Sequence, residues 1–505
     1  MQYRLDDANA NGQNPVCPSE LPHGGSGVWR NRARAAQNRK VSAIKPQSVT
    51  RALAELSVDR AHTFPTEVLA LARDCLIDGI GNMLAGSAQP VGAQVREFAR
   101  ACGGVPESPV LGSSLRTSGP MAAFCHGTFH RALDFDNCWL PLDHPVAASH
   151  AALLSLAMAS GRAVPGRELL EALVVGMETQ ARLRIASDLA THKAGAKGRG
   201  IFGTLAATAA CCRLLGLSAQ QTEMAFGISA GRAGGVDNSG TMSNPADSGL
   251  AARNGIESAM LARAGFTARA GIIEAASGFL QYLGDDADLQ SIVARFARPW
   301  RLAELGVAFK KYPCQYPTHW GVDAVLAALD GRVLPPDQIE SLELAITVTP
   351  GHSSFNERSL DAVQPNSGLA GKFNVAYTAV VALLHGTVRI EDFSDEAVRS
   401  ADVAGALGKT RISLLPAITR FEDMRAQARI TLRNGVTLSG SMSRPHGIWG
   451  DPLSADELAA KFRDCASPAL APDEAEALRA RLLTIGQDAD VRSLAPLLVP
   501  QRSSA

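Results

Sequence analysis

Residues 126–150, HGTFHRALDFDNCWLPLDHPVAASH, decide the fold, and apolar helical patterns lie on both sides of them. This stretch holds four histidines and three aspartates. His126, His130 and Asp134 are spaced four residues apart, so on a helix they would share one face. Titratable groups gathered beside apolar helices are candidates for acid and base catalysis, so we expect the functional site here.

The histidines of this stretch also have plainer interpretations. His126 is predicted to be structural or to lie at the surface, and His130 is a candidate to hydrogen-bond the loop of Asp134 and Asp136. The spacing His-x3-His beside carboxylates also resembles a set of metal ligands. The sequence has no His-Glu-x-x-His motif, and we predict no metal.

The composition limits the class of protein. The 505 residues carry 49 Lys plus Arg against 49 Asp plus Glu, so no overall positive field favours nucleic acid. No segment reaches the roughly 18 to 20 uncharged apolar residues of a membrane helix. The nine cysteines form no Cys-x-x-Cys pair, which favours a reducing compartment, and the N-terminus has no apolar signal core. We expect a cytoplasmic protein of more than one domain that binds neither nucleic acid nor membrane.

Most of the chain shows helical periodicity. Residues 1–46 are rich in Asn, Gly, Pro, Ser and Arg without a period, so they are predicted to be a disordered tail. A first helix is predicted from Pro65 to Gly86. Further helices are predicted at 96–102, 147–160, 167–182, 202–215 and 250–264, with capping boxes at Ser218–Gln221 and Ser454–Glu457.

The pattern changes after residue 310. Residues 341–349 alternate between apolar and polar side chains, as in a half-buried strand. Asn434-Gly435 separates two short apolar runs and is a strong hairpin signal. Because helical patterns at 318–329 and 372–385 lie between these strands, we predict a smaller α+β unit.

A basic, glycine-rich segment, His192 to Gly200, precedes the helix predicted at 202–215. It is either a solvated loop or an anion-binding loop that leads into the N-terminus of that helix. A second glycine-rich segment, residues 231–240, is not a dinucleotide-binding fingerprint, because no strand precedes it.

Several motifs together resemble the MmgE/PrpD family. They are LDFDN at 133–137, His144-Pro145, FGTLAATAA at 202–210, LLGLS at 214–218, GLAARNG at 249–255, FKKYPC at 309–314 and PLSADELAAKFRDC at 452–465. The family includes 2-methylcitrate dehydratase, cis-aconitate decarboxylase and iminodisuccinate epimerase. The resemblance covers nearly everything from residue 48 onward.

The resemblance implies a mainly α fold. It implies a large all-helical domain over 47–309, a smaller α+β lid domain over 310–445, and C-terminal helices over 446–505 that pack back on the helical domain. It also implies a cleft between the two domains, a homodimer, and no metal or organic cofactor.

The resemblance also carries site residues onto this chain. Asp134, His144 and Lys310 are the expected catalytic residues: His144 matches a general acid/base and Lys310 a carboxylate ligand. The expected substrate-binding residues are His130, Asp136, Lys197, Arg199, Asn244 and Asp247.

This sequence departs from the family pattern at several of these positions. Lys197 stands where the family has a histidine, Asn244 where it has a lysine, and Asp247 where it has a histidine. Asn137 and Cys138 replace an aspartate and a threonine. Either Lys197 and Arg199 restore the positive charge, or the substrate has fewer or differently placed carboxylates, or catalysis has been lost.

We therefore expect a cofactor-free lyase or isomerase that acts on a small carboxylic acid. Such a reaction moves a proton next to a carboxylate and needs cations near the developing negative charge. The first expectation is dehydration of a hydroxy acid similar to 2-methylcitrate, and decarboxylation or epimerisation are the alternatives. A catalytically silent binding or partner paralogue is the non-enzyme alternative.

Overall fold

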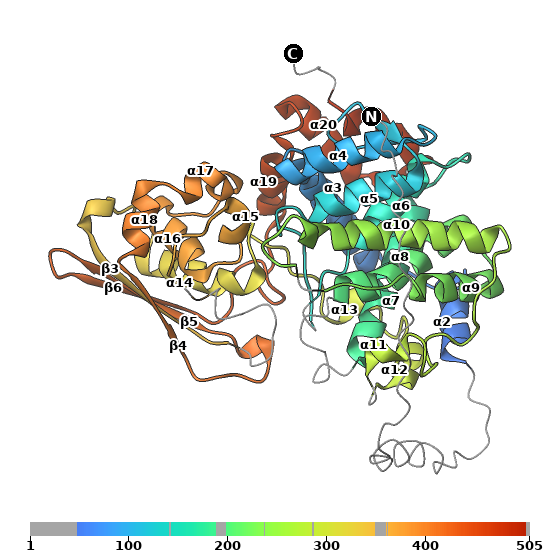
Figure 1. Cartoon of the computed structure of the whole chain (residues 1–505), viewed down its shortest axis with the longest axis horizontal. Coiled ribbons are helices and arrows are strands. Elements are labelled where there is room, and N and C mark those ends of the chain that lie inside the picture. Colours follow the sequence, from blue (N-terminus) through green and yellow to red (C-terminus); the bar gives the residue numbers. More distant parts are fainter. Residues whose placement is uncertain are drawn as a thin grey trace, which may run out of the picture. The chain divides into compact units, whose positions relative to one another are not determined.

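The computed structural model describes residues 48–140, 143–187, 198–236, 238–284, 287–348, 360 and 362–500. In these residues the fold is mainly α (Figure 1). The tail predicted at residues 1–46 lies outside the described residues. No helix in the described ranges is long and apolar enough to cross a membrane.

Helices make the larger of two main hydrophobic cores. They are α2 (Val49–Val58), α3 (Thr66–Ser87), α4 (Pro90–Cys102), α5 (Gly119–Arg131), α6 (Ala147–Met158), α7 (Gly166–Ala186), α8 (Gly198–Leu215), α9 (Ala219–Ala230) and α10 (Ser243–Arg263). A Cβ at Gly86 on α3 would lie 1.9 Å from the carbonyl oxygen of Phe129 on α5, so these two helices meet through their backbones. This close contact fixes the C-terminal end of α5, where the central stretch begins.

Short elements connect these helices and the rest of the chain. They are β1 (Ser108–Pro109), β2 (Arg116–Thr117), α11 (Leu280–Leu283), α12 (Leu289–Ala294), α13 (Arg301–Glu304), α15 (Gly368–Gly371), α17 (Asp395–Val398) and 3-10 turns at Tyr316–Thr318, Pro336–Gln338, Ile390–Phe393, Phe421–Asp423 and Ile485–Gln487.

The helix predicted from Pro65 to Gly86 is confirmed as α3, but three other helices begin earlier than their apolar periodicity indicated. These are α4, α8 and α10. In α4, Pro90 occupies the first turn, where the missing N–H costs nothing. In α10, the first turn holds polar residues and Pro245. The early starts matter because they place Arg199 on the first turn of α8 and Asn244 on the first turn of α10.

The second core is built on a four-stranded sheet. Its strand order is β4 (Thr410–Leu414), β3 (Ile339–Ile346), β5 (Ala426–Leu432) and β6 (Thr437–Met442), with only β3 and β4 parallel. Helices α14 (His319–Leu329), α16 (Val375–His385) and α18 (Ala401–Leu407) lie over one face (Figure 1). The predicted strand is confirmed as β3, and the predicted hairpin as β5–β6, with Gly435 at φ +85° in its turn.

The chain ends in helices that share the larger core. They are α19 (Ala455–Ala466), α20 (Pro472–Leu483) and the 3-10 helix Val491–Leu498, and Phe462, Leu478 and Leu494 are among the buried side chains they contribute. Both predicted capping boxes are confirmed. Ser218 and Gln221 cap α9, and Ser454 and Glu457 cap α19.

His446 joins the second core to α19 through charged side chains. Its Nε2 lies 2.9 Å from both carboxylate oxygens of Glu457, and its Nδ1 lies 3.1 Å from Asp451. Its main-chain N–H donates to Asp323 on α14. The pKa of His446 is raised, mainly by the hydrogen bond with Glu457. Both ring nitrogens face carboxylates, and each can donate a hydrogen bond to its carboxylate only when it carries a proton.

We expect protonated His446 to stabilise the fold at acidic pH. Because its pKa is raised by folding, its contribution to the free energy of unfolding is complete below the unfolded-state pKa of about 6.5 and is lost as the pH rises through the folded-state pKa. The melting temperatures of wild type and His446→Gln should therefore differ most at acidic pH and converge at alkaline pH. A difference that does not change with pH would contradict this expectation.

Candidate active site

The segment after α5 does not continue the helix. Asp134 has a positive φ of 50°, and its N–H donates to the carbonyl of Arg131, which closes a tight turn. The expectation that His126, His130 and Asp134 share one helical face is therefore wrong, because α5 ends at Arg131. The turn instead directs the carboxylates of Asp134 and Asp136 back toward the end of the helix, where Arg131 binds both of them.

Arg131 contacts both aspartates and the histidine of the central stretch. Its Nη2 lies 2.7 Å from Asp134 Oδ1, and its Nη1 contacts Asp136 Oδ1 and lies 2.8 Å from His144 Nδ1. Burial alone would raise the pKa of Asp136, but Arg131 and then His144 outweigh it and hold that pKa well below its usual range. Asp136 is therefore a fixed anion that orients its neighbours.

His144 is held on its main chain by α7. Gln180 Nε2 donates to the His144 carbonyl at 3.0 Å and to Asp143 Oδ2 at 2.8 Å. On the ring, Nδ1 lies 2.8 Å from Arg131 Nη1 and 2.9 Å from Asp136 Oδ2. Arginine only donates and an ionised carboxylate only accepts, so these two neighbours favour opposite tautomers of His144.

The pKa of His144 is lowered by burial first and by Arg131 second, so its ring is mainly neutral near pH 7. A bound anion works in the opposite direction, because negative charge beside an imidazole favours its protonated form. Binding an acid beside His144 should therefore make it a proton donor.

Lys310 is brought to Asp134 by a short pairing of two distant segments. Cys138 and Ala308 exchange both of their main-chain hydrogen bonds, and Lys310 follows two residues later. Its Nζ donates to the carbonyl and to Oδ2 of Asp134, the latter at 2.9 Å, and to the Cys314 carbonyl at 3.2 Å. These contacts use all three ammonium donors. Burial would lower the pKa of Lys310, but Asp134 raises it, so the lysine stays charged.

Arg199 extends from the first turn of α8 to the first turn of α10. Its Nη2 donates to Asn244 Oδ1 and lies 3.3 Å from Asp247 Oδ2. Its Nε is buried without a hydrogen-bond partner in the described chain. The guanidinium of Arg199 thus lies beside Asn244, the position where the family resemblance would predict a lysine.

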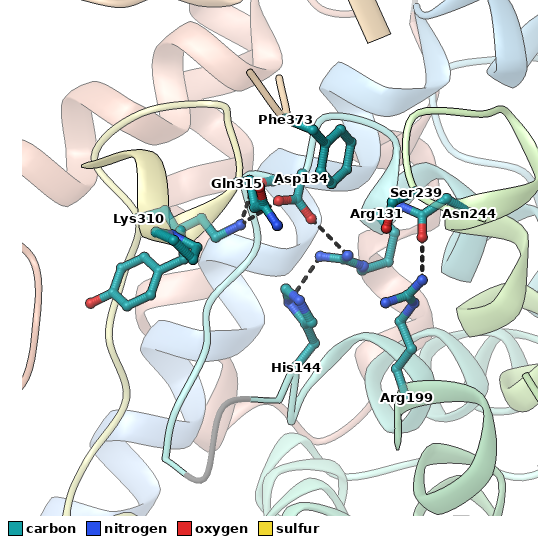
Figure 2. Close-up of a pocket in the computed structure, with 11 residues that line it drawn as sticks. Arg131, Asp134, His144, Arg199, Ser239, Asn244, Lys310, Gln315 and Phe373 are labelled. Carbon is teal, nitrogen blue, oxygen red and sulfur yellow. Dashed lines mark hydrogen bonds and ion pairs between the residues drawn. The ribbon is translucent and has the colours of Figure 1, made fainter. Parts of the chain in front are cut away.

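These side chains line one cavity of about 50 Å³ (Figure 2). Its lining residues are Arg131, Asp134, His144, Arg199, Ser239, Asn244, Lys310, Gln315, Tyr316, Pro317 and Phe373. Figure 2 shows Arg131 at the centre, between Asp134 and His144, with Arg199 directed toward Asn244. The structure thus brings all three expected catalytic residues together with Arg199 and Asn244.

The remaining expected residues have different placements. Asp136 and Asp247 do not line the cavity themselves. Asp136 binds the lining residue Arg131, and Asp247 binds the lining residue Arg199. His130 is buried against the His150 ring, and neither nitrogen of His130 has a hydrogen-bond partner among the described residues. Lys197 lies outside the described residues.

The structure confirms a structural role for His126. Its Nε2 accepts the Leu111 N–H at 3.2 Å and its Nδ1 lies 2.8 Å from Ser155 Oγ. Burial lowers its pKa to about 3, so it is a neutral core histidine. In the part of the chain that the structure describes, no three His, Cys, Asp or Glu side chains gather closely enough to hold a metal ion.

Sequence reasoning missed Arg131, the cation that organises the site. A signal was present, because Arg131 is in the last turn of a helix and three residues before Asp134, a spacing that favours an ion pair. Phe373 and Gln315 carried no comparable local signal. They reach the pocket only through the tertiary fold.

The pocket on this mainly α scaffold contains cations that pair with carboxylates, and one imidazole that can exchange a proton. Such a pocket is typical of an anion-binding site with acid–base capacity.

Comparison with known proteins gives the family. Residues 51–292 match the MmgE/PrpD N-terminal domain and residues 312–484 the MmgE/PrpD C-terminal domain. The chain therefore belongs to the MmgE/PrpD family, as its motifs indicated. It is similar to enzymes: it is 28% identical over 429 residues to the cis-aconitate decarboxylase of Mus musculus, a match that covers 81% of this chain and 85% of the relative. The cis-aconitate decarboxylase of Homo sapiens is also 28% identical, with 81% and 86% covered, and that of Aspergillus terreus is 24% identical, with 86% and 91% covered.

Proposed function

We propose that this protein is a lyase that decarboxylates a small carboxylic acid, with His144 as the proton carrier. One observation carries the proposal. Of the described residues that line the pocket, His144 is the one imidazole, and burial and Arg131 lower its pKa. Asp134 is held in its charged form by Lys310 and Arg131, and Lys310 is held in its charged form by Asp134. The similarity to cis-aconitate decarboxylases supports the same reaction class.

In the proposed reaction, the carbon–carbon bond to one carboxylate breaks and carbon dioxide leaves. The electron pair stays on the carbon and spreads toward a neighbouring carboxylate, whose developing charge is stabilised by Arg131 and Arg199. The His144 imidazolium, formed when the anion binds, delivers its proton to that carbon and becomes neutral. Solvent then returns a proton to His144.

This proposal changes the order of the expectations drawn from sequence. Dehydration came first there, but it needs a base to remove a proton and an acid to protonate the departing hydroxide. Decarboxylation needs one proton delivery, which His144 alone supplies. Dehydration and epimerisation remain the competing reactions, and a silent paralogue remains the non-enzyme alternative.

The charges around the pocket favour a substrate with fewer than three carboxylates. Within the described residues, each cation already has an anionic partner: Arg131 binds Asp134 and Asp136, Lys310 binds Asp134, and Arg199 contacts Asp247. Three cations thus face three carboxylates. Each carboxylate of a bound acid therefore shares a cation with an aspartate, and a buried charge left without a partner costs roughly 3–5 kcal/mol. This cost rises with each added carboxylate, so a tricarboxylate is favoured least.

A screen of small acids by proton NMR in deuterated water tests the reaction. Decarboxylation places deuterium on the carbon that loses carbon dioxide, elimination yields a new alkene, and epimerisation exchanges a proton without a change of formula. We expect decarboxylation of a mono- or dicarboxylate. Turnover by elimination alone would contradict the proposal, and binding without turnover would favour the silent paralogue.

The double substitution Asn244→Lys with Asp247→His should shift preference toward tricarboxylates. It adds one positive charge and removes one negative charge beside Arg199, which restores the charge pattern of the family motif. Competition assays with 2-methylcitrate and cis-aconitate against the preferred smaller acid measure the shift. If the wild-type protein already uses either tricarboxylate with kcat/KM of about 10⁴ M⁻¹s⁻¹ or more, the charge argument is wrong.

A further inference from the structure

Three lysines bind the backbone of the segment Ala132–Asp136. Lys372 Nζ donates to the Ala132 carbonyl at 3.2 Å, Lys310 Nζ to the Asp134 carbonyl, and Lys461 Nζ to the Phe135 carbonyl at 2.9 Å. All three lysines are buried. We call Lys310, Lys372 and Lys461 the lysine clamp. Its members come from three separate parts of the chain, and Lys461 belongs to α19.

This segment has two physical reasons to need such support. It follows the C-terminal end of α5, where helix carbonyls lack intrahelical partners and carry partial negative charge. It also contains Asp134 at φ +50°, a conformation that costs a residue other than glycine roughly 1–3 kcal/mol and persists only where the surroundings enforce it. Ammonium groups on the carbonyls of Ala132, Asp134 and Phe135 meet both needs.

Lys461 is bound on several sides. Besides the Phe135 carbonyl, its Nζ lies 2.7 Å from Asp78 Oδ1 and 4.0 Å from the centre of the Phe135 ring. Asp78 in turn accepts from Asn137 Nδ2 at 3.4 Å, so the contacts of Lys461 extend to the residue after Asp136. An ion pair and a cation–π contact fix this ammonium against the segment more firmly than a single hydrogen bond would.

Burial disfavours the charged form of Lys372. Burial lowers its pKa to about 8, against the opposing effect of Asp134. The next residue, Phe373, lines the pocket, and the Lys372 carbonyl accepts the N–H of Gln315, another lining residue. Lys372 therefore connects the backbone after α5 to the residues Phe373 and Gln315, which line the pocket beside Asp134 (Figure 2).

We propose that Lys372 and Lys461, which do not line the pocket, are positioning residues that hold Asp134 and Asp136 in place and, through Arg131 and Asp136, orient His144. This inference rests on the proposed function for its catalytic meaning, whereas the mechanical role of the two lysines stands apart from it. Lys310 differs from these two lysines because it lines the pocket itself.

Hydrogen exchange measured by mass spectrometry on the full chain tests the mechanical role without a substrate. Lys372→Met and Lys461→Met keep apolar bulk and remove the ammonium. Each should speed amide exchange in peptides that cover 132–138 by roughly 10- to 100-fold, the effect of losing a hydrogen bond to a charged donor. Lys461→Arg keeps a cation over the Phe135 ring and should restore most of the protection.

Arg182→Met is the matched control. Arg182 is a buried cation that binds a carboxylate, Glu178, at 2.7 Å and a main-chain carbonyl, Pro299, at 2.7 Å, and it does not line the pocket. Its loss should speed exchange around 178–182 and 299–304 and leave 132–138 unchanged. If Lys461→Met does not fold, the double change Asp78→Asn with Lys461→Met removes both buried charges and takes its place.

Unchanged exchange at 132–138 in both lysine variants, or a rise spread evenly over the whole chain, would overturn the proposal. Kinetics add a second readout once the acid screen has found a substrate. A positioning role predicts that kcat falls in the lysine variants with KM little changed, whereas Arg182→Met keeps kcat. If no acid is turned over, the exchange result still decides whether the lysines hold the segment.

Discussion

Replacement of His144 by glutamine should lower kcat by roughly 10²- to 10⁴-fold, the usual contribution of a positioned acid or base. Glutamine keeps a polar side chain beside Arg131 and Asp136 but cannot carry a proton to the substrate. The loss should appear in kcat more than in KM, because carboxylate binding is assigned to Arg131 and Arg199. Initial rates on the acid found by the screen measure it.

His446→Gln serves as the control for this experiment. His446 also pairs with carboxylates, but it does not line the pocket, so its replacement should leave kcat near that of wild type at a temperature where both proteins are folded. Turnover by His144→Gln at a rate close to wild type would remove His144 from the mechanism.

Replacement of Arg131 by methionine should lower the free energy of unfolding by roughly 3–5 kcal/mol, the range for a buried ion pair that loses one partner. The side chains of Arg131 and Asp136 are each only 1% exposed, and Arg131 also binds Asp134. Without the guanidinium, the Asp136 carboxylate keeps His144 as its one side-chain partner among the described residues. Urea denaturation of wild type and variant measures the difference.

A second substitution tests whether the lost free energy of unfolding comes from the unpaired carboxylate of Asp136. Asp136→Asn in the Arg131→Met background removes the uncompensated carboxylate and should recover part of the lost free energy. If Arg131→Met costs less than about 1 kcal/mol, the value expected of an exposed ion pair, then the charge cluster is not what stabilises this segment.

Much of the candidate site followed from short motifs. Asp134 and His144 lie ten residues apart in one stretch, and Lys310 was placed by the FKKYPC motif. The structure gathers all three around one cavity. The departure at Asn244 was also visible in the sequence, and Arg199 was one of two residues expected to restore the positive charge. The direct contact between Arg199 and Asn244 depends on the tertiary structure, which brings the first turns of α8 and α10 together.

The lysine clamp had no signal in the sequence. Lys372 and Lys461 are 240 and 326 residues away from the carbonyls they bind, and nothing in their own neighbourhoods indicates a partner. The burial of His144 likewise had no signal in the sequence. The lowered pKa of His144 depends first on how completely the surrounding helices exclude water, which a linear pattern does not encode.

The sequence by itself determined the features that rest on interactions within a few residues. Helical periodicity in α3, the capping boxes at Ser218 and Ser454 and the Asn434-Gly435 hairpin depend on bonds between residues at most four apart, and these predictions are confirmed. Only the tertiary structure decided where α5 ends. No glycine or proline stops that helix after Arg131. Cations from distant segments bind the carbonyls that follow, and they stabilise a turn that the local sequence alone does not favour.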